Sequence, residues 1–245
     1  GGFSNGATGT ARAIGGSTLA LSNTFTNTGT LGSGGVTAIT GGANNDTIIN
    51  TGGTIKGNII LGDGNVNSVT STKLIDGFIT GGSGNDTVTN TGGTIDGSVT
   101  LFGGNNAVTN SGATAKIIGD VSGGSGNDTV TNTLGTITGN IDLDDGAVNS
   151  LTNTGTVGDA GINDVDVVGG SGNDTVSNLL GTINGGLELG DGNDVVTNTG
   201  TISGGIDLGN GFDAAGKVNS VTNSKSITGS IAGGDGNDSV TNNSG

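Results

Sequence analysis

The chain of 245 residues carries 56 glycines and a net charge of −15, and it contains no proline, cysteine, histidine, methionine, tryptophan or tyrosine. Without cysteine it can form no disulfide framework. Without a basic patch it lacks the electrostatic footprint of a nucleic-acid-binding protein, whereas an acidic surface favours solubility and divalent cations. No apolar run reaches the roughly 18 residues of a membrane-spanning helix, so we expect no membrane insertion by this segment.

Residues 1–26 form the least regular part of the sequence. The ends of a stacked repeat array expose unpaired backbone, and natural arrays cover them. We therefore expect an irregular N-terminal coil or cap over 1–26, with a flexible leader as the alternative. The repeat array is expected to occupy 27–245 and to continue beyond the C-terminus.

From residue 27 onward the chain repeats one unit, which is clearest in GGSGNDTVTNTGGTIDGSVTL at 81–101. Each unit has a glycine-rich turn, a short strand closed by asparagine, a second turn and a longer strand. The closing asparagines are spaced about 20 residues apart, the length of one turn of a β-solenoid. They fall at Asn50, Asn90, Asn110, Asn132, Asn153, Asn178, Asn198, Asn223 and Asn242, with Ser71 in one slot. The pattern predicts an all-β fold, a single-stranded parallel β-solenoid (β-helix), right-handed by the usual crossover rule.

Alternation of apolar and polar residues predicts which side chains point inward. In the longer strand the inward positions read Ile55, Gly57, Ile59 and Leu61, and other units repeat this order with glycine in the second column. Because glycine inside a strand marks a close approach of backbone, we expect the opposite wall to come near at that column. The closing asparagine is also inward, where stacked amides can form a hydrogen-bonded ladder.

The last inward column of the longer strand alternates between leucine and glycine in successive coils, which lets stacked layers interdigitate. It begins Leu61, Gly81, Leu101, Gly123. The alternation breaks where Leu189 is followed by Leu208, and the next loop, 209–220, is longer. We expect a local bulge there.

Four turns match the nonapeptide G-G-x-G-x-D-x-U-x and so resemble the calcium-binding RTX repeats. They begin at Gly81, Gly123, Gly169 and Gly233. The resemblance implies that calcium is bound by turn carbonyls and by a set of aspartates. The set is Asp46, Asp86, Asp128, Asp174, Asp194 and Asp238.

RTX motifs run in tandem, whereas here neutral residues such as Asn106 and Asn149 stand near the aspartate slot in the intervening coils. The alternative to a calcium site is therefore a tight turn whose aspartate caps local N–H groups. Alternating Asp with neutral residues would then relieve like-charge repulsion along the stack without any metal.

A column of hydroxyl side chains lies on the outer side of the short strand. It runs through Thr70, Thr89, Thr109, Thr131, Thr152, Ser177, Thr197, Thr222 and Thr241. Such an array resembles the flat Thr-x-Thr surfaces of some β-solenoid antifreeze proteins, which implies ice binding. The alternative is ordinary β-propensity on a solvated face.

Catalysis is not expected, because without His or Cys the Ser and Thr hydroxyls lack their usual activating base. Clustered carboxylates cut polysaccharides in some β-helix enzymes. Here the candidates would be Asp142, Asp144 and Asp145, or Asp164 and Asp166. No aromatic residue lies beside these acids in the sequence to hold a sugar ring, which argues against this class.

The recurring string N-[ST]-G-T-[IL]-x-G-x-[IVL] resembles the repetitive passenger regions of bacterial autotransporters and related surface adhesins. It occurs as NTGGTIKGNI, NTGGTIDGSV, NTLGTITGNI and NTGTISGGI. The resemblance implies export and a location at the bacterial cell surface or outside the cell. Its specificity for function is low, because such rods serve adhesion, self-association, surface-layer building or spacing.

We therefore expect a non-catalytic structural rod of a bacterial surface or extracellular fibre or adhesin, which self-associates end-to-end or laterally. A ligand on a host or neighbouring-cell surface is a further expected partner. The alternative is a calcium-binding, RTX-like surface-layer or adhesin segment, and a third hypothesis is an ice-binding solenoid.

Overall fold

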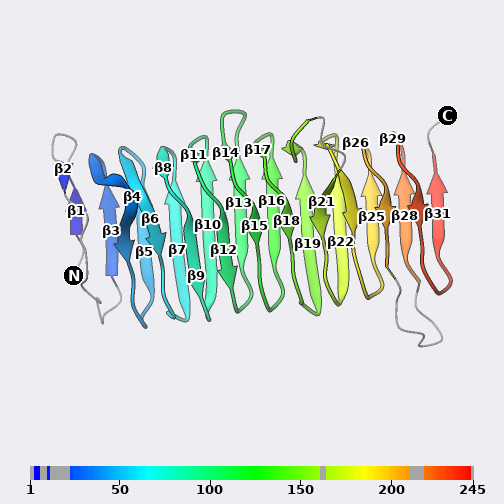
Figure 1. Cartoon of the computed structure of the whole chain (residues 1–245), viewed down its shortest axis with the longest axis horizontal. Helices are drawn as coiled ribbons and strands as arrows, with labels where there is room; N and C mark the ends of the chain where they lie inside the picture. Colours follow the sequence, from blue (N-terminus) through cyan, green and yellow to red (C-terminus); the bar gives the residue numbers. More distant parts are fainter. Residues whose placement is uncertain (1–2, 6–9, 12–22, 161–163, 210–217, 244–245) are drawn as a thin grey trace.

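The computed structural model describes residues 3–5, 10–11, 23–160, 164–209 and 218–243. These residues form strands and turns that wind into a parallel β-solenoid of about 21 residues per coil. Figure 1 shows the coils stacked side by side along the long axis, from β1 at one end to β31 at the other. The predicted all-β solenoid is confirmed. No helix long and apolar enough to cross a bilayer occurs in the described residues.

One wall of the solenoid is a twelve-stranded sheet to which each coil contributes one strand, parallel and in register with the next. Its strands are β1 (Phe3–Asn5), β3 (Asn23–Asn27), β5 (Asp46–Asn50), β7 (Val66–Ser71), β10 (Asn85–Thr91), β13 (Ala107–Ser111), β16 (Thr129–Thr133), β19 (Val148–Asn153), β22 (Asn173–Asn178), β25 (Val195–Asn198), β28 (Ser220–Asn223) and β31 (Ser239–Asn242). This sheet contains the segments predicted as short strands, and they are the longer ones in most coils.

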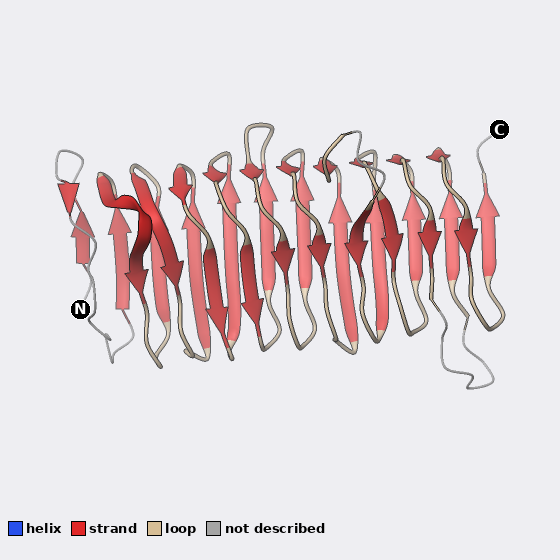
Figure 2. Cartoon of the chain, viewed as in Figure 1, coloured by secondary structure: helices blue, strands red, loops and turns tan. Residues whose placement is uncertain are grey.

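The facing wall is a nineteen-stranded sheet, in which most coils contribute two short strands separated by a break. Figure 2 shows the loops that interrupt these strands. The strands are β2 (Thr10–Ala11), β4 (Thr30–Thr40), β6 (Thr54–Ile60), β8 (Leu74–Asp76), β9 (Ile79–Gly82), β11 (Thr94–Ile95), β12 (Val99–Phe102), β14 (Lys116–Ile117), β15 (Val121–Ser122), β17 (Thr136–Ile137), β18 (Ile141–Asp142), β20 (Thr156–Val157), β21 (Val165–Val168), β23 (Thr182–Ile183), β24 (Gly186–Glu188), β26 (Thr201–Ile202), β27 (Ile206–Asp207), β29 (Ser226–Ile227) and β30 (Ile231–Ala232). The longer strand expected from the sequence is thus continuous in β6 but broken in most other coils.

The break falls at the glycine column, and the structure corrects the reason given for these glycines. A Cβ at Gly97 would lie 2.7 Å from the backbone of Gly77, and a Cβ at Gly77 would lie 2.5 Å from the backbone of Gly57. The close neighbour is therefore the same column of the preceding coil and not the opposite wall. Side chains would push the coils apart at this point, so the column requires glycine.

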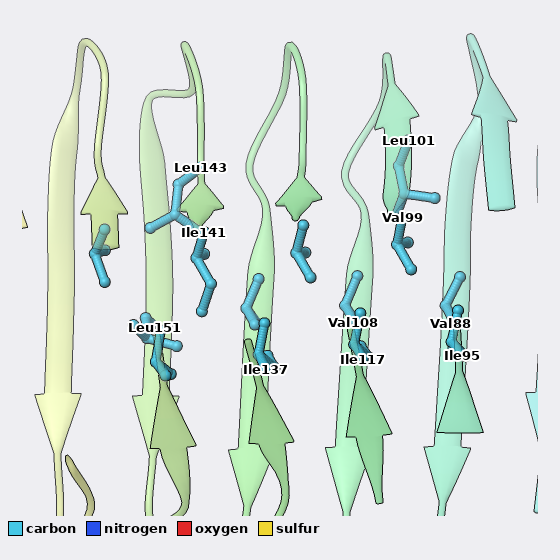
Figure 3. Close-up of a cluster of buried hydrophobic side chains, with 14 of the residues drawn as sticks. Val88, Ile95, Val99, Leu101, Val108, Ile117, Ile137, Ile141, Leu143 and Leu151 are labelled. Atoms are coloured by element: carbon cyan, nitrogen blue, oxygen red, sulfur yellow. The ribbon is translucent and has the colours of Figure 1, made fainter. Parts of the chain in front are cut away.

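The interior is filled by columns of Ile, Val and Leu that repeat from coil to coil. Figure 3 shows Val88 beside Ile95 and Val108 beside Ile117, each pair with one residue from either sheet, and it labels Ile137 of the facing sheet and Leu151 of the twelve-stranded sheet in the coils that follow. All six are at most 3% exposed. A single coil could not enclose such a core, so each coil is stabilised mainly by its two neighbours.

The closing asparagines form the predicted ladder inside this core. The Nδ2 of Asn110 donates to Oδ1 of Asn132 at 2.9 Å, and Asn132 donates in the same way to Asn153 at 2.9 Å. The amides also donate to backbone carbonyls of the adjoining turns, as Asn132 does to Gly135 at 3.1 Å. We call this column the asparagine ladder, and these bonds supply most of its buried amides with the hydrogen-bond partners that they need.

Strand pairing begins within the segment predicted as a cap. β1 pairs with β3 and β2 pairs with β4, both in parallel, while the rest of 1–22 lies outside the described residues. The bulge predicted at 209–220 also falls largely outside them. Described shifts of register lie between Gly32 and Ile39 and between Val165 and Val167.

Candidate functional surfaces

A second buried polar column lies within one residue of the start of ten strands of the twelve-stranded sheet, four residues before the asparagine ladder. It contains all six aspartates of the predicted calcium set and the asparagines of the coils between them. We call it the Asx column: Asp46, Asn67, Asp86, Asn106, Asp128, Asn149, Asp174, Asp194, Asn219 and Asp238. Asp238 is half-buried, and every other member is buried. The aspartates thus face the interior of the solenoid.

Hydrogen bonds connect the Asx column from one coil to the next. The side-chain oxygen of Asn106 accepts the backbone N–H of Asp86 at 2.8 Å, and that of Asn149 accepts the N–H of Asp128 at 2.9 Å. Between coils, Nδ2 of Asn67 also donates to Oδ1 of Asp86 at 2.9 Å. The side chain of Asn67 and the backbone N–H of Asn106, which donates to Oδ1 of Asp128 at 2.7 Å, therefore supply donors to the buried carboxylates.

Each aspartate of the column except Asp194 is paired with a glycine in the last inward column of its own coil. A Cβ at Gly123 would lie 2.6 Å from Cγ of Asp128, and a Cβ at Gly169 would lie 2.5 Å from Oδ2 of Asp174. The same pairing joins Gly41 to Asp46, Gly81 to Asp86 and Gly233 to Asp238. In coils whose Asx-column residue is asparagine (asparagine coils), leucine fills the space that the carboxylate occupies in coils whose Asx-column residue is aspartate (aspartate coils). The predicted alternation of leucine with glycine therefore accommodates buried charge as well as interdigitating layers.

Burial makes four of these carboxylates weaker acids. Desolvation raises the pKa of Asp128 to about 6, although the amide and the backbone of Asn106 favour its ionised form. Desolvation and then the negative charge of Asp194 raise the pKa of Asp174 to about 7. The pKa values of Asp46 and Asp86 are also raised by burial, against a backbone hydrogen bond that lowers them. The interior of the rod therefore contains acids that titrate close to neutral pH.

The geometry of the Asx column does not build a multi-carboxylate cage for calcium. Within the described chain, no three acidic side chains come close enough to share one ion. A coil supplies at most one carboxylate to the column, and that carboxylate lies in the wall of the solenoid. Calcium prefers six to eight oxygen ligands, so turn carbonyls and water would have to supply most of them. Calcium binding by these aspartates stays a prediction.

The outer surface of the twelve-stranded sheet carries the predicted hydroxyl column and a second column beside it. We call this surface the hydroxyl face. In the second column Thr87 and Thr129 stand on either side of Ala107, and register pairing keeps both columns aligned along the stack. Hydroxyls even bond between coils, as Ser150 Oγ does to Thr129 Oγ1 at 3.2 Å. The outward positions of the described strands hold Thr, Ser, Asn and some apolar residues, but no ionisable side chain.

Ionisable side chains lie instead on the facing sheet, in the turns and in the Asx column. Lys56 and Lys116 are exposed on the nineteen-stranded sheet, Asp96 is exposed directly after β11, and Glu188 pairs in register with Asp207. The two walls of the rod therefore differ sharply in charge. The hydroxyl face is neutral, and most of the net charge of −15 lies elsewhere.

Three of the acids considered for glycan cleavage accept backbone hydrogen bonds of turns. Oδ1 of Asp142 accepts the N–H of Asp144 at 3.1 Å, and Oδ1 of Asp145 accepts the N–H of Ser171 at 3.2 Å. Asp166 is 1% exposed, accepts the N–H of Gly185 and has its pKa raised to about 6 by burial. Asp164 is exposed beside it in sequence.

The structure also brings an aromatic residue into the same groove as Asp144, which sequence reasoning missed. Phe102 is 55% exposed and lies with Asp144 among the residues that line an open groove of about 620 Å³. Aligning the turns would have given a signal, because Phe102 pairs in register with Gly82 of the preceding coil. This turn therefore differs from the aligned turn of the preceding coil by an aromatic side chain in place of glycine.

Comparison with known proteins supports the fold. No family model and no curated protein matches the sequence. A solved structure that matches is a hyperactive, Ca2+-dependent, β-helical antifreeze protein from an Antarctic bacterium. It has a TM-score of 0.62 and 23% sequence identity, over 94% of this chain and 82% of that one. At this identity the similarity shows the β-helical fold alone.

Proposed function

We propose that this chain is a non-catalytic structural rod of a bacterial cell-surface or extracellular fibre, and that copies associate side by side through the hydroxyl face. The observation that carries the proposal is the distribution of charge. The hydroxyl face extends over the described strands of the twelve-stranded sheet without an ionisable side chain, in a chain whose net charge is −15.

Electrostatics favours this face for lateral contact. Two copies that approach through their acidic turns or through the facing sheet repel each other, and unpaired charges buried in an interface are costly. The hydroxyl face avoids both costs, and its regular columns of Thr and Ser can exchange hydrogen bonds with an identical array. The resemblance to autotransporter passenger regions supports a location outside the cell.

Matched lysine variants test the proposal. Thr89→Lys, Thr131→Lys and Thr152→Lys together place three charges on the hydroxyl face. Thr94→Lys, Thr136→Lys and Thr156→Lys place the same charges on the other sheet of the same coils, in the register column that already holds Lys116. We expect the parent and the second variant to associate in sedimentation velocity at high protein concentration, and the first variant to remain monomeric. Equal association of both variants, or a parent that stays monomeric, would contradict lateral association.

Ice binding through the same face is the second candidate function. It is favoured by the neutral hydroxyl array and by the structural similarity to an antifreeze protein. Strand spacing of about 4.8 Å and a repeat of about 6.6 Å along each strand give this array a lattice-like regularity. The same lysine variants decide between the two: ice-growth inhibition that only the hydroxyl-face variant loses would favour this function over self-association. Repeating both assays with calcium and with chelator tests the predicted calcium dependence.

A further inference from the structure

The turn that contains Phe102 places a bulky side chain at a backbone position where most aligned turns have glycine. Phe102 has φ of 66°, in the left-handed region that glycine adopts at the aligned positions Gly62, with φ of 76°, and Gly124, with φ of 91°. Only one other aligned turn in the described residues has a non-glycine residue in this conformation, at Asp144, where φ is 57°. A bulky residue that stays in the left-handed region is strained, and such strain persists mainly where the side chain has a use.

Two carboxylates approach Phe102 from opposite sides along the stack. Oδ1 of Asp63 accepts the N–H of Ser83 at 3.2 Å, in the coil before Phe102. Oδ2 of Asp144 accepts the N–H of Gly124 at 2.9 Å, in the coil after it. Each carboxylate therefore reaches from two coils away toward the coil of the ring. Asp63, Phe102 and Asp144 all line the groove of about 620 Å³, which has no lysine or arginine in its lining.

We propose that this groove, the Phe102 groove, binds an arginine or lysine side chain of a partner polypeptide. The face of an aromatic ring attracts a cation within about 6 Å of its centre, and flanking carboxylates add charge-assisted hydrogen bonds. Arginine fits best, because its planar guanidinium stacks on a ring and donates to two carboxylates. An anionic ligand is excluded by repulsion from both acids, and the acidic rod steers cations toward the groove.

The groove lies at the turn after β12 and not on the hydroxyl face, so the inference does not depend on lateral association. A rod that presents such a groove on its outer edge can capture a basic segment of a neighbouring protein. The aromatic ring distinguishes specific capture from the general attraction of basic peptides to an acidic protein, because removing the ring leaves the charge unchanged.

The test uses a dye-labelled peptide Gly-Arg-Gly-Arg-Gly and its Gln-for-Arg counterpart, measured by fluorescence anisotropy in about 0.15 M salt to screen distant charges. We expect Phe102→Gly to weaken binding of the arginine peptide by about fivefold, as loss of one cation–π contact predicts. Asp144→Asn and Asp63→Asn should each weaken it as well. Phe78→Ser is the matched control, since Phe78 is exposed outside the groove and precedes Ile79, whose register partner Val99 is preceded by Ser98. It should bind like the parent.

Stability and ring chemistry separate this role from a structural one. Phe102→Gly should unfold at the same or a higher temperature than the parent, because glycine relieves the left-handed strain. Phe102→Leu keeps apolar bulk but removes the ring, and it should lose binding to a similar degree. Unchanged affinity in Phe102→Gly or Phe102→Leu would overturn the proposal. The proposal would also be overturned if substitution of Phe102 weakened binding of the glutamine peptide as much as binding of the arginine peptide.

Discussion

Asp174 shows how a single carboxylate limits the stability of the stack. Its backbone N–H donates to Oδ1 of Asp194 at 2.8 Å, so two acids occupy adjacent coils where the Asx column otherwise alternates. Both carboxylate oxygens of Asp174 are buried and neither has a well-formed hydrogen-bond partner. Buried charge without donors is costly. The folded chain therefore retains a proton on Asp174 more readily than the unfolded chain does.

This gives stability a defined dependence on pH. The pKa of Asp174 is about 7 in the folded state against an ordinary value of 3.8, so between these values the folded state binds more protons. Stability from this group is then greatest at acid pH, decreases as pH rises through the window, and is lowest above pH 7. We expect Asp174→Asn to raise the free energy of unfolding by about 1–3 kcal/mol at pH 8 and to change it little at pH 4. Denaturation followed by circular dichroism measures both.

Asp86→Asn is the matched control for Asp174→Asn. Asp86 stands between two asparagine coils, and its carboxylate accepts hydrogen bonds from Asn67 at 2.9 Å and from the N–H of Gly82 at 2.9 Å. Because the carboxylate of Asp86 already has hydrogen-bond donors, neutralising it should raise the free energy of unfolding at pH 8 by less than Asp174→Asn does. A larger gain at Asp86 than at Asp174 would show that the missing donors are not the source of the cost.

At the scale of the strand, the asparagine ladder has one gap, at Ser71 in β7. Nδ2 of Asn50 donates to Oγ of Ser71 at 3.1 Å, but the serine is too short to continue to the next coil. As a result, Oδ1 of Asn90 in β10 is buried without a hydrogen-bond partner. A buried acceptor left unsatisfied costs roughly 1–3 kcal/mol, and this one lies in the middle of the core.

We expect Ser71→Asn to close the gap and stabilise the chain by about 1 kcal/mol. The fit has a precedent, because Asn223 precedes a turn of the same length, N-S-K-S against S-T-K-L, and donates to the carbonyl of Lys225 at 3.4 Å. The denaturation midpoint measures the change, and Ser71→Ala should lower it. A midpoint for Ser71→Asn at or below the parent value would mean that the larger side chain strains the turn.

The strands could be predicted from the sequence because side-chain direction in a strand has a period of two. That period placed Val88 and Asn90 inside correctly. Extended two residues toward the N-terminus, it also places Asp86 inside, but the resemblance to a calcium-binding turn suggested a loop residue. The alternation of inward and outward positions thus predicts that the carboxylate of Asp86 points inward, whereas the calcium-binding motif predicts that it lies in a loop.

Turn conformation could not be predicted in the same way. Whether Phe102 adopts a left-handed φ depends on the stacking of its coil on glycine turns before and after it, which the local sequence does not encode. The reason for the glycine column was likewise wrong, since periodicity cannot tell a neighbouring coil from the opposite wall. Both features depend on contacts between residues about one coil apart.

For the whole molecule, the repeating unit is two coils and not one. A coil with glycine and aspartate is followed by a coil with leucine and asparagine, and Figure 3 shows the leucines of such alternate coils, Leu101 and Leu143. The aspartate coil supplies a carboxylate that needs donors, and the asparagine coil supplies them. Stacking is therefore favourable between unlike coils and unfavourable between two aspartate coils.

Deletions of whole coils test this directly. Removing 87–128 joins Asp86 to Thr129 and brings Asp86 next to Asn149, so the alternation survives. Removing 87–106 joins Asp86 to Ala107 and brings Asp86 next to Asp128, with Gly81 beside Gly123. The shorter deletion keeps more of the rod, yet we expect it to be less stable, because it stacks two carboxylates and two side-chain-free positions on each other.

Circular dichroism at pH 5 and pH 8 distinguishes the two deletions. Stacked carboxylates raise each other's pKa, as Asp194 does to Asp174, so the one-coil deletion should lose stability as pH rises and the two-coil deletion should follow the parent more closely. If stability depended only on the number of coils, the two-coil deletion would be the weaker at both pH values. If the one-coil deletion is the more stable of the two at pH 8, the two-coil repeating unit is rejected. If the two-coil deletion is the more stable, the number of coils cannot explain the result, and the identity of neighbouring coils does.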